Sequence, residues 1–207
     1  MFIECFGIPG AGKTTVTKIL EDTLGASVVP IHVSKRYVFL FLLHNPVFSA
    51  RWMLLLVRAC NSDNVWHLFR FKLSLFLNTA GRVHMAQQLD RKGKFVILDE
   101  GLVQRVFSLY ETKQTSDVYQ RIITMLPIRH TVLSVVYTGE MYTAGRVGTV
   151  RSRLGNEYKK QWRGTMKNNF QIISGVITKQ KFSVIHYSRD ESDHQMQALI
   201  DTVQELL

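Results

Sequence analysis

The sequence has few cysteines and no long apolar run, and each shortage excludes a class of protein. Only Cys5 and Cys60 occur in 207 residues, which is too few for a disulfide framework or a four-cysteine zinc site. The apolar segment 37–60 is interrupted at His44-Asn45-Pro46 and again at Arg51, so its uninterrupted stretches fall far below the roughly 18–20 residues that cross a bilayer. The first residues do not form a cleavable signal pattern. We therefore expect a cytoplasmic protein without a membrane-spanning helix.

Acidic residues are outnumbered, which leaves a formal net charge of +10. The excess is densest in residues 151–170, where six Lys or Arg residues stand against one Glu. Such a balance attracts polyanions, namely nucleotides, nucleic acid or an anionic membrane surface, although a solvated basic surface is the alternative. Hydrophobic residues make up 46% of the chain, enough for a substantial core, and no low-complexity linker divides it. We expect a single domain over residues 1–207.

Short apolar runs alternate with helical stretches along the chain. The runs cover residues 2–6, 27–31, 95–98, 132–137 and 182–187, and the helical stretches cover 12–24, 35–91, 157–179 and 192–207. Continuous apolar runs are typical of parallel strands that are buried on both faces. Within the second helical stretch, Asn45-Pro46 predicts a break between two short helices. The pattern predicts an α/β domain of three layers.

One motif carries the strongest chemical signal. Residues 7–14, Gly-Ile-Pro-Gly-Ala-Gly-Lys-Thr, match the phosphate loop G-x-x-x-x-G-K-[ST], with an apolar run before it and a helix after it. The glycines let backbone N–H groups turn inward around an anion, and the following helix adds its positive end. Lys13 would reach the β- and γ-phosphates, and Thr14 would offer a hydroxyl to Mg²⁺. We expect the nucleotide to contact Gly7, Gly10, Ala11, Gly12, Lys13, Thr14 and Thr15.

Two carboxylates follow the third apolar run. Asp99 and Glu100 end the string Phe-Val-Ile-Leu-Asp-Glu, which places them at the carboxyl edge of a parallel sheet, beside the phosphate loop. Asp99 is the candidate Mg²⁺ ligand, acting through water. Glu100 could accept a proton from an acceptor hydroxyl, or it could cap a helix. The sequence leaves open whether Asp99 or Glu100 is the base.

Arginines among glycines form a candidate lid after the fourth run. Arg146, Arg151 and Arg153 lie in a segment that also contains Gly145, Gly148 and Gly155. A glycine-punctuated basic segment can cover the transferring phosphoryl group and neutralise its charge, although a basic surface loop is the alternative. Arg105 is a further candidate for contact with a phosphate or with the acceptor.

With these residues assembled, the chain resembles the P-loop nucleoside and nucleotide kinases, the thymidylate-kinase-like and deoxynucleoside-kinase-like group. The resemblance implies a five-stranded parallel sheet in the order 2-3-1-4-5, a helical acceptor region at about 35–92 and an arginine lid at about 143–156. It implies ATP and Mg²⁺ as cofactors, with Lys13, Asp99, Glu100, Arg146 and Arg151 in catalysis. Thr14 and Asp99 would hold the metal, Arg153 would bind phosphate, and Arg189 would lie near the adenine.

The resemblance has departures that leave the acceptor undetermined. Asp99-Glu100-Gly101 stands where deoxynucleoside kinases carry Glu-Arg-Ser and thymidylate kinases carry Asp-Arg-Tyr. A small acceptor, most simply a nucleoside or nucleotide, is one hypothesis. A kinase or ATPase acting on nucleic acid, or on a glycan or lipid intermediate at a membrane surface, is the second, and a nucleotide switch is the third. The apolar segment 37–57 could bind substrate, contact a membrane or only pack within the domain. A dimer is plausible, but the sequence does not determine the oligomeric state.

Overall fold

A computed structural model of the chain describes residues 1–8, 11–59, 65–110, 112–127, 131–137, 156–180, 182–189 and 193–207. Its strands are β1 (Phe2–Phe6), β2 (Ser27–Val28), β3 (Val96–Leu98), β4 (Thr131–Tyr137) and β5 (Val184–Arg189). They form one sheet in the order β2-β3-β1-β4-β5, and every pairing is parallel. The predicted fold class and strand order are therefore confirmed.

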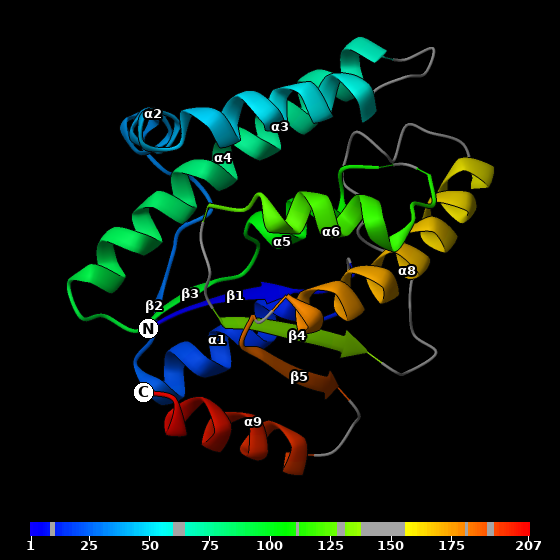
Figure 1. Ribbon diagram of the computed structural model, residues 1–207. Helices are drawn as coiled ribbons and strands as arrows, with labels where there is room; N and C mark the ends of the chain where they lie inside the picture. Colours follow the sequence, from blue (N-terminus) through cyan, green and yellow to red (C-terminus); the bar gives the residue numbers. More distant parts are fainter. Residues whose placement is uncertain are drawn as a thin grey trace.

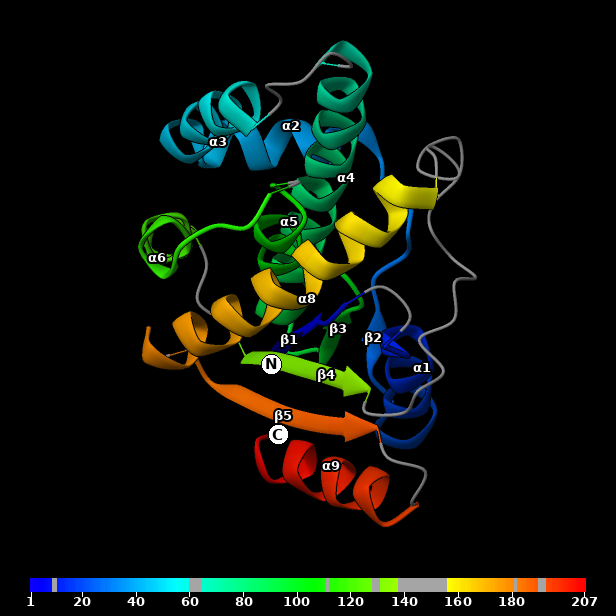
Figure 2. The same cartoon turned by 90° about the vertical axis from the view of Figure 1, so that its right-hand side faces the viewer.

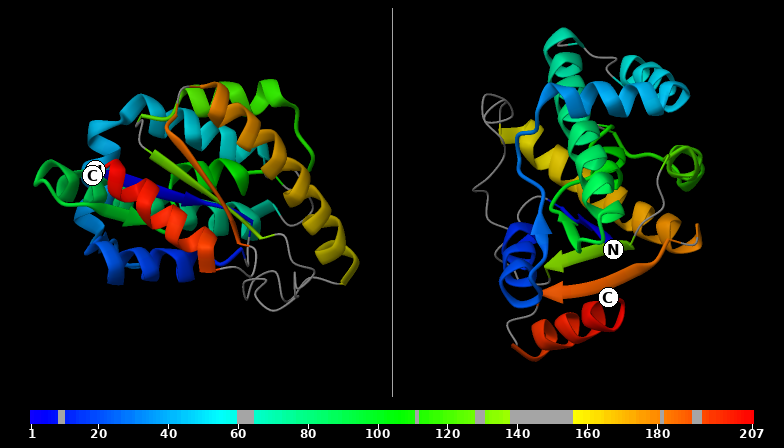
Figure 3. Two further views of the ribbon diagram at one scale, coloured as in Figure 1. Left: turned by 90° about the horizontal axis from the view of Figure 1, so that it is seen from below. Right: turned by 90° about the vertical axis from the view of Figure 1, so that its left-hand side faces the viewer.

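Helices cover both faces of the sheet, as expected for three layers (Figures 1 and 2). Helices α1 (Lys13–Leu24) and α9 (Asp193–Glu205) lie on one face, which Figure 3 shows from below. The other face carries α4 (Val65–Arg91), α5 (Leu102–Phe107), α6 (Ser116–Thr124) and α8 (Asn156–Lys179). Helices α2 (Lys35–His44) and α3 (Pro46–Ala59) lie over α4, far from the strands.

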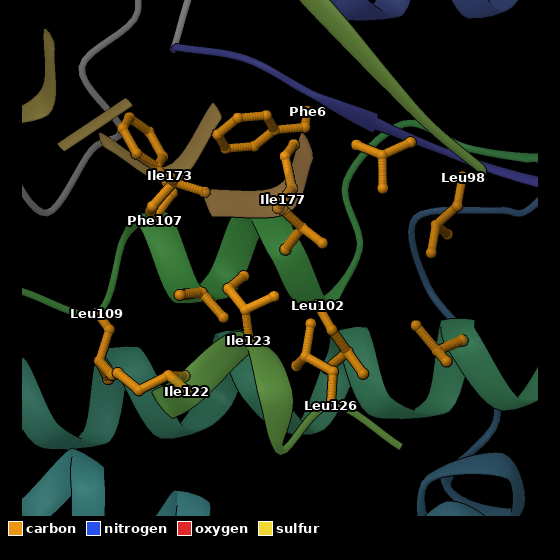
Figure 4. Close-up of a cluster of buried hydrophobic side chains, with 14 of the residues drawn as sticks. Phe6, Leu98, Leu102, Phe107, Leu109, Ile122, Ile123, Leu126, Ile173 and Ile177 are labelled. Atoms are coloured by element: carbon orange, nitrogen blue, oxygen red, sulfur yellow. The ribbon is translucent and has the colours of Figure 1, made fainter. Parts of the chain in front are cut away.

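Strand β1 shows why the sheet is covered on both sides. Phe2 and Phe6 point into the larger core, whereas Ile3 and Cys5 point into the core beneath α1 and α9, as the two-residue period of a strand requires. Phe6 stacks on Phe170 of α8 at 4.8 Å between ring centroids, and Figure 4 shows it above α5 and α8. Cys5 is fully buried, and this burial raises the pKa of its thiol.

The structure differs from the sequence prediction in three local places. Strand β2 stops at Val28 rather than at residue 31, since Pro30 has no N–H to donate to a ladder. Strand β5 begins two residues later than predicted and extends to Arg189. Helices α5 and α6, which were not predicted, fill residues 102–107 and 116–124; both are shorter than the roughly 11–18 residues over which helical periodicity is read from a sequence.

The segment 35–59 breaks where the sequence predicted. Helix α2 ends at His44 and α3 starts at Pro46, a position at which proline loses nothing because a first-turn N–H has no helical partner. In the described part of the chain, no single helix has the length and apolar character to cross a membrane. Helices α2 and α3 taken together meet that criterion, but they are bent by 103° at the break.

Candidate nucleotide-binding site

The phosphate loop follows β1 at the carboxyl edge of the sheet and leads into α1. Gly12 has a φ of 85°, a left-handed conformation that favours glycine, and α1 starts at the next residue. The Gly7 N–H donates to Oε1 of Gln104 at 3.0 Å, which ties the start of the loop to α5. Ala11 is buried. Pro9 and Gly10 lie outside the described residues. The described part of the loop thus lies where the sequence predicted, between β1 and α1.

Lys13 is folded back over this loop. Its Nζ donates to the carbonyl oxygens of Gly7 at 2.9 Å and of Ile8 at 3.3 Å, and the residue is only 7% exposed. Burial lowers the pKa of Lys13, and the negative charges of Glu100 and Asp99 partly oppose that change. The two carboxylates therefore act electrostatically on the loop lysine. A bound phosphate would place negative charge beside the buried ammonium of Lys13, which favours its protonated form.

The two threonines of the first turn of α1 are exposed to solvent. Thr14 and Thr15 both lie in this turn, and the Thr14 carbonyl accepts a hydrogen bond from the Thr17 hydroxyl at 3.0 Å. Hydroxyls at a helix N-terminus lie where the positive end of the helix dipole favours an anion. Both side chains therefore remain candidates for the roles predicted from the motif.

Each predicted carboxylate pairs with a buried arginine. Asp99 forms an ion pair with Arg82 of α4, and Glu100 forms one with Arg105 of α5. Arg82 also donates to the carbonyl oxygens of Val29 at 3.2 Å and of Glu100 at 3.4 Å. It thereby joins the ends of β2 and β3. Asp99 is 20% exposed and Glu100 is 39% exposed, so Glu100 is the more accessible of the two carboxylates.

The charge of Glu100 is set by opposing effects. Burial raises the pKa of its carboxyl, but the guanidinium of Arg105, followed by Lys13 and Arg82, outweighs burial and leaves the pKa below its ordinary value. Glu100 is therefore an anion at neutral pH. Its carboxylate can accept a proton or orient a cation, although the lowered pKa makes it a weaker base.

Arg105 also lines a hollow beneath the helical segment. The Arg105 Nε donates to the Thr79 hydroxyl at 2.9 Å. The hollow has an accessible volume of about 10 Å³, which is room for about one water molecule. It is lined by Trp52, Leu56, Lys72, Leu75, Phe76, Arg105, Ser108 and Leu109. The Trp52 ring stacks on Phe76 at 5.2 Å, and its buried Nε1 has no hydrogen-bond partner among the described residues. Lys72 donates to the Leu109 carbonyl at 2.5 Å. The charged groups that line the hollow are both cations.

A third carboxylate, which is fully buried, supports the site. Glu4 of β1 is fully buried and accepts a hydrogen bond from the backbone N–H of Gln104 at 3.0 Å. A Cβ on Gly101 would lie 2.3 Å from the Glu4 carboxyl, so the residue after Glu100 must be glycine for this contact to form. Glu4, Arg82 and Gln104 were not singled out from the sequence. Of these three residues, only Glu4 could have been noticed in the sequence, because it is the one charged residue in an apolar run.

The remaining predicted residues are only partly placed. Arg146, Arg151 and Arg153, with nearly all of the predicted lid, lie outside the described residues. Arg189 is the last residue of β5, where it pairs with Tyr137 of β4, at the same edge of the sheet as the phosphate loop. Among the described residues, no three His, Cys, Asp or Glu side chains gather in a way that could hold a metal. Mg²⁺ sites with nucleotides need few protein ligands, and Thr14 with Asp99 fits that pattern.

Solved structures of kinases share this architecture. The chain is similar to deoxyadenosine kinase from M. mycoides, with 17% identity over 99% of this chain and 100% of that chain and a TM-score of 0.57. The fold is that of the P-loop kinases. It is also similar to thymidylate kinase from Candida albicans, with 15% identity over 99% and 91% of the two chains and a TM-score of 0.56. Thymidylate kinase from Ehrlichia chaffeensis has 14% identity over 100% and 97%, with a TM-score of 0.50. No family model and no curated protein sequence matches the chain.

At these identities the similarity establishes the fold and leaves the acceptor undefined. The P-loop kinase fold matches the architecture implied by the phosphate loop and the acidic strand end. Helices α2, α3 and α4 form a helical unit over one face of the sheet (Figure 1). The reaction and its acceptor depend on this chain's own residues.

Proposed function

We propose that this protein transfers the γ-phosphoryl group of ATP to a small acceptor, a nucleoside or a nucleotide. The observation that carries the proposal is the meeting of a phosphate-loop lysine with the charges of Glu100 and Asp99 at one edge of a P-loop kinase sheet. The similar solved structures are a deoxyadenosine kinase and thymidylate kinases, which favours this class of acceptor.

The triphosphate side of the site uses residues of the loop and of β3. Lys13 would exchange its hydrogen bonds to Gly7 and Ile8 for the β- and γ-phosphate oxygens. Mg²⁺, bound with ATP, would neutralise charge on the same oxygens. The Thr14 hydroxyl and the Asp99 carboxylate would hold the metal, and Arg82 keeps Asp99 in place from the opposite side.

The acceptor side is formed by α5 and the helical segment. Glu100 is the more exposed carboxylate, so we assign it the contact with the acceptor hydroxyl, and Asp99 the metal. Trp52, Lys72 and Arg105 present N–H donors around the hollow. These donors suit carbonyl or phosphate oxygens, but the hollow has an accessible volume of only about 10 Å³, so an acceptor would enter it only if the helical segment moved outward. Region 35–92 would thus be the acceptor-binding region.

The lid is part of the same proposal. Arg146, Arg151 and Arg153 would close over the phosphates, exclude water and stabilise the charge that spreads over the transferring group. Arg189, at the end of β5, would lie beside the base of the nucleotide.

The test is ATP consumption with Mg²⁺ across nucleosides, nucleoside monophosphates, simple sugars, and single-stranded DNA and RNA. We expect one small acceptor to stimulate turnover and to gain one phosphate by mass. Lys13→Ala should abolish that turnover, whereas Lys18→Ala, an exposed lysine of the same helix, should not change it. Activity of the Lys13 variant near that of the wild type would refute the assignment.

A second candidate is a kinase or ATPase that acts on nucleic acid, or on a glycan or lipid intermediate at a membrane surface. The basic run at 151–170 and the exposed apolar side chains of α2 and α3 favour it. Stimulation by nucleic acid that falls steeply with salt would support this candidate, because counterion release governs such binding. A nucleoside acceptor would show a much weaker salt dependence.

A further inference from the structure

Helices α2 and α3 are apolar on two opposite sides. Their inner sides pack into the core through Phe41, Phe48, Trp52 and Leu56. Their outer face carries five large hydrophobic side chains that are 59–65% exposed, namely Phe39, Leu43, Val47, Leu54 and Val57. A helix that is hydrophobic all round is normally buried on all sides, so the outer face is expected to be covered by something else.

The exposed residues follow helical spacing and therefore form continuous stripes. On α3 the exposed positions are 46, 47, 50, 51, 54, 57 and 58, and the series 47, 50, 54, 57 has steps of three or four residues, which places it along one side of the helix. On α2, Arg36, Phe39 and Leu43 repeat the same spacing. Both helices pack on α4, on the side away from the sheet (Figure 1). The outer face is thus presented at one end of the molecule.

Helices α1 and α9 do not share this feature, and α4 has a single such exposed side chain among its described residues, Trp66. The exposed positions of α1 include Thr14, Lys18, Glu21 and Asp22, and those of α9 include Gln197, Asp201 and Glu205. These helices have polar outer sides, as is usual for a helix that faces water. The contrast places the apolar exposure on α2 and α3 rather than on the surface in general.

The charge around the outer face has one sign. Arg36, Arg51 and Arg58 lie within the exposed stripes, and the sequence has no Asp or Glu from residue 23 to residue 62. Over residues 23–89 seven Lys or Arg residues stand against one acidic residue. A second copy of this chain docked through the same face would bring like charges together without a compensating carboxylate.

Apolar side chains interleaved with arginines suit one partner best. We propose that the outer face of α2 and α3 binds the surface of an anionic lipid bilayer. Phe39, Leu43, Val47, Leu54 and Val57 would enter the boundary between headgroups and acyl chains, while the arginines contact lipid phosphates. Nucleic acid would use the cations, but it offers no apolar environment to aliphatic side chains. This inference does not depend on which acceptor is phosphorylated.

The test is sedimentation of the full chain with vesicles of phosphatidylcholine alone, or of phosphatidylcholine with about 30% phosphatidylglycerol. We expect binding to the anionic vesicles that weakens as salt rises, because the charge attraction is screened. Leu54→Ser with Val57→Ser should lower the partition coefficient at least about tenfold. Leu206→Ser with Leu207→Ser, which changes two exposed apolar residues outside the face, should leave it unchanged.

A charge pair completes the test. Arg51→Gln with Arg58→Gln should lower binding about tenfold or more, whereas Lys159→Gln with Lys160→Gln, in the densest basic run of the sequence, should have a much smaller effect. Circular dichroism checks that each variant is folded. Absence of binding, equal loss with both charge pairs, or no change on Leu54→Ser with Val57→Ser would overturn the proposal. A dimer in solution that the Leu54 and Val57 substitutions dissociate would overturn it in favour of a second copy.

Discussion

At the scale of single residues, two arginines set the charges of the candidate site. Arg82 and Arg105 come from different helices, and each pairs with one of the two adjacent carboxylates. Both guanidinium groups are almost wholly buried. Removing one partner of a buried ion pair leaves the other charge uncompensated, which is more damaging than removing both. The site therefore depends on residues that have no motif of their own.

Arg82→Met should show this dependence as a loss of stability. It leaves Asp99 without its cation and the Val29 carbonyl without its donor. We expect the free energy of unfolding to fall by about 2–4 kcal/mol. Arg91→Met, an exposed position on the same helix, should change it by less than about 0.5 kcal/mol. Urea denaturation measures both, and equal effects would contradict the structural role.

Glu100→Gln should alter the pH dependence of stability. The folded-state pKa of Glu100 is lowered, because Arg105, Lys13 and Arg82 outweigh burial. The carboxylate therefore contributes stability above its ordinary pKa of about 4.3, and this contribution is lost as pH falls through the lowered value. We expect the variant to be less stable than the wild type at pH 7, with a difference that shrinks in acid. Glu21→Gln, which is exposed, is the control.

The same variant tests the assignment of the base. If Glu100 accepts the acceptor proton, Glu100→Gln should lower turnover by about 10²-fold or more. Since the loss of the carboxylate also releases Arg105, KM for the acceptor should be measured together with kcat. A much smaller loss of turnover would indicate that Asp99 is the base.

At the scale of elements, the start of α5 connects the core to the site. Gly101 is the N-cap of this helix, and Glu4 accepts the N–H of Gln104 within its first turn. A carboxylate at a helix N-terminus satisfies an N–H that has no helical partner. Gln104 in turn binds the Gly7 N–H. Helix α5, which was not predicted from the sequence, thus holds the start of the phosphate loop.

Gly101→Ala should break this connection. The new Cβ would lie 2.3 Å from the Glu4 carboxyl, which is buried and cannot move to solvent. We expect a loss of about 1–3 kcal/mol in the free energy of unfolding. Gly175→Ala is the matched control, since Gly175 lies in the interior of α8 with no atom within 4 Å of the added carbon. That change should stabilise the protein by about 0.5–1 kcal/mol, and a loss in both variants would contradict the contact argument.

At the scale of the whole molecule, ligand binding should be visible in thermal stability. Mg²⁺-ATP at about 100 times its Kd would add about 2.7 kcal/mol, which raises Tm by about 5–10 °C for a domain of this size. EDTA should remove most of the increase, since the metal and Lys13 neutralise the same oxygens. Lys13→Ala should show no increase by differential scanning fluorimetry. An equal rise in that variant would place the nucleotide elsewhere.

The sequence by itself determined the layers and the phosphate loop. Apolar runs, the glycine-rich motif and the acid pair at 99–100 are local signals, because each depends on neighbours in the chain. The break at Asn45-Pro46 is local in the same sense. These signals sufficed to predict the parallel α/β domain and the strand that ends in Asp99, while the strand order came from the resemblance to known kinases.

Only the tertiary structure decided what surrounds these signals. Arg82 meets Asp99 across 17 residues, and Glu4 meets Gln104 across 100; no pattern along the chain encodes such pairs. Helices α5 and α6 were likewise found only in the folded domain. The apolar outer face of α2 and α3 is the clearest case. The sequence shows an apolar segment at 37–57. Only the fold separates the side chains that fill the core from those that face outward, because burial is a property of the assembled domain.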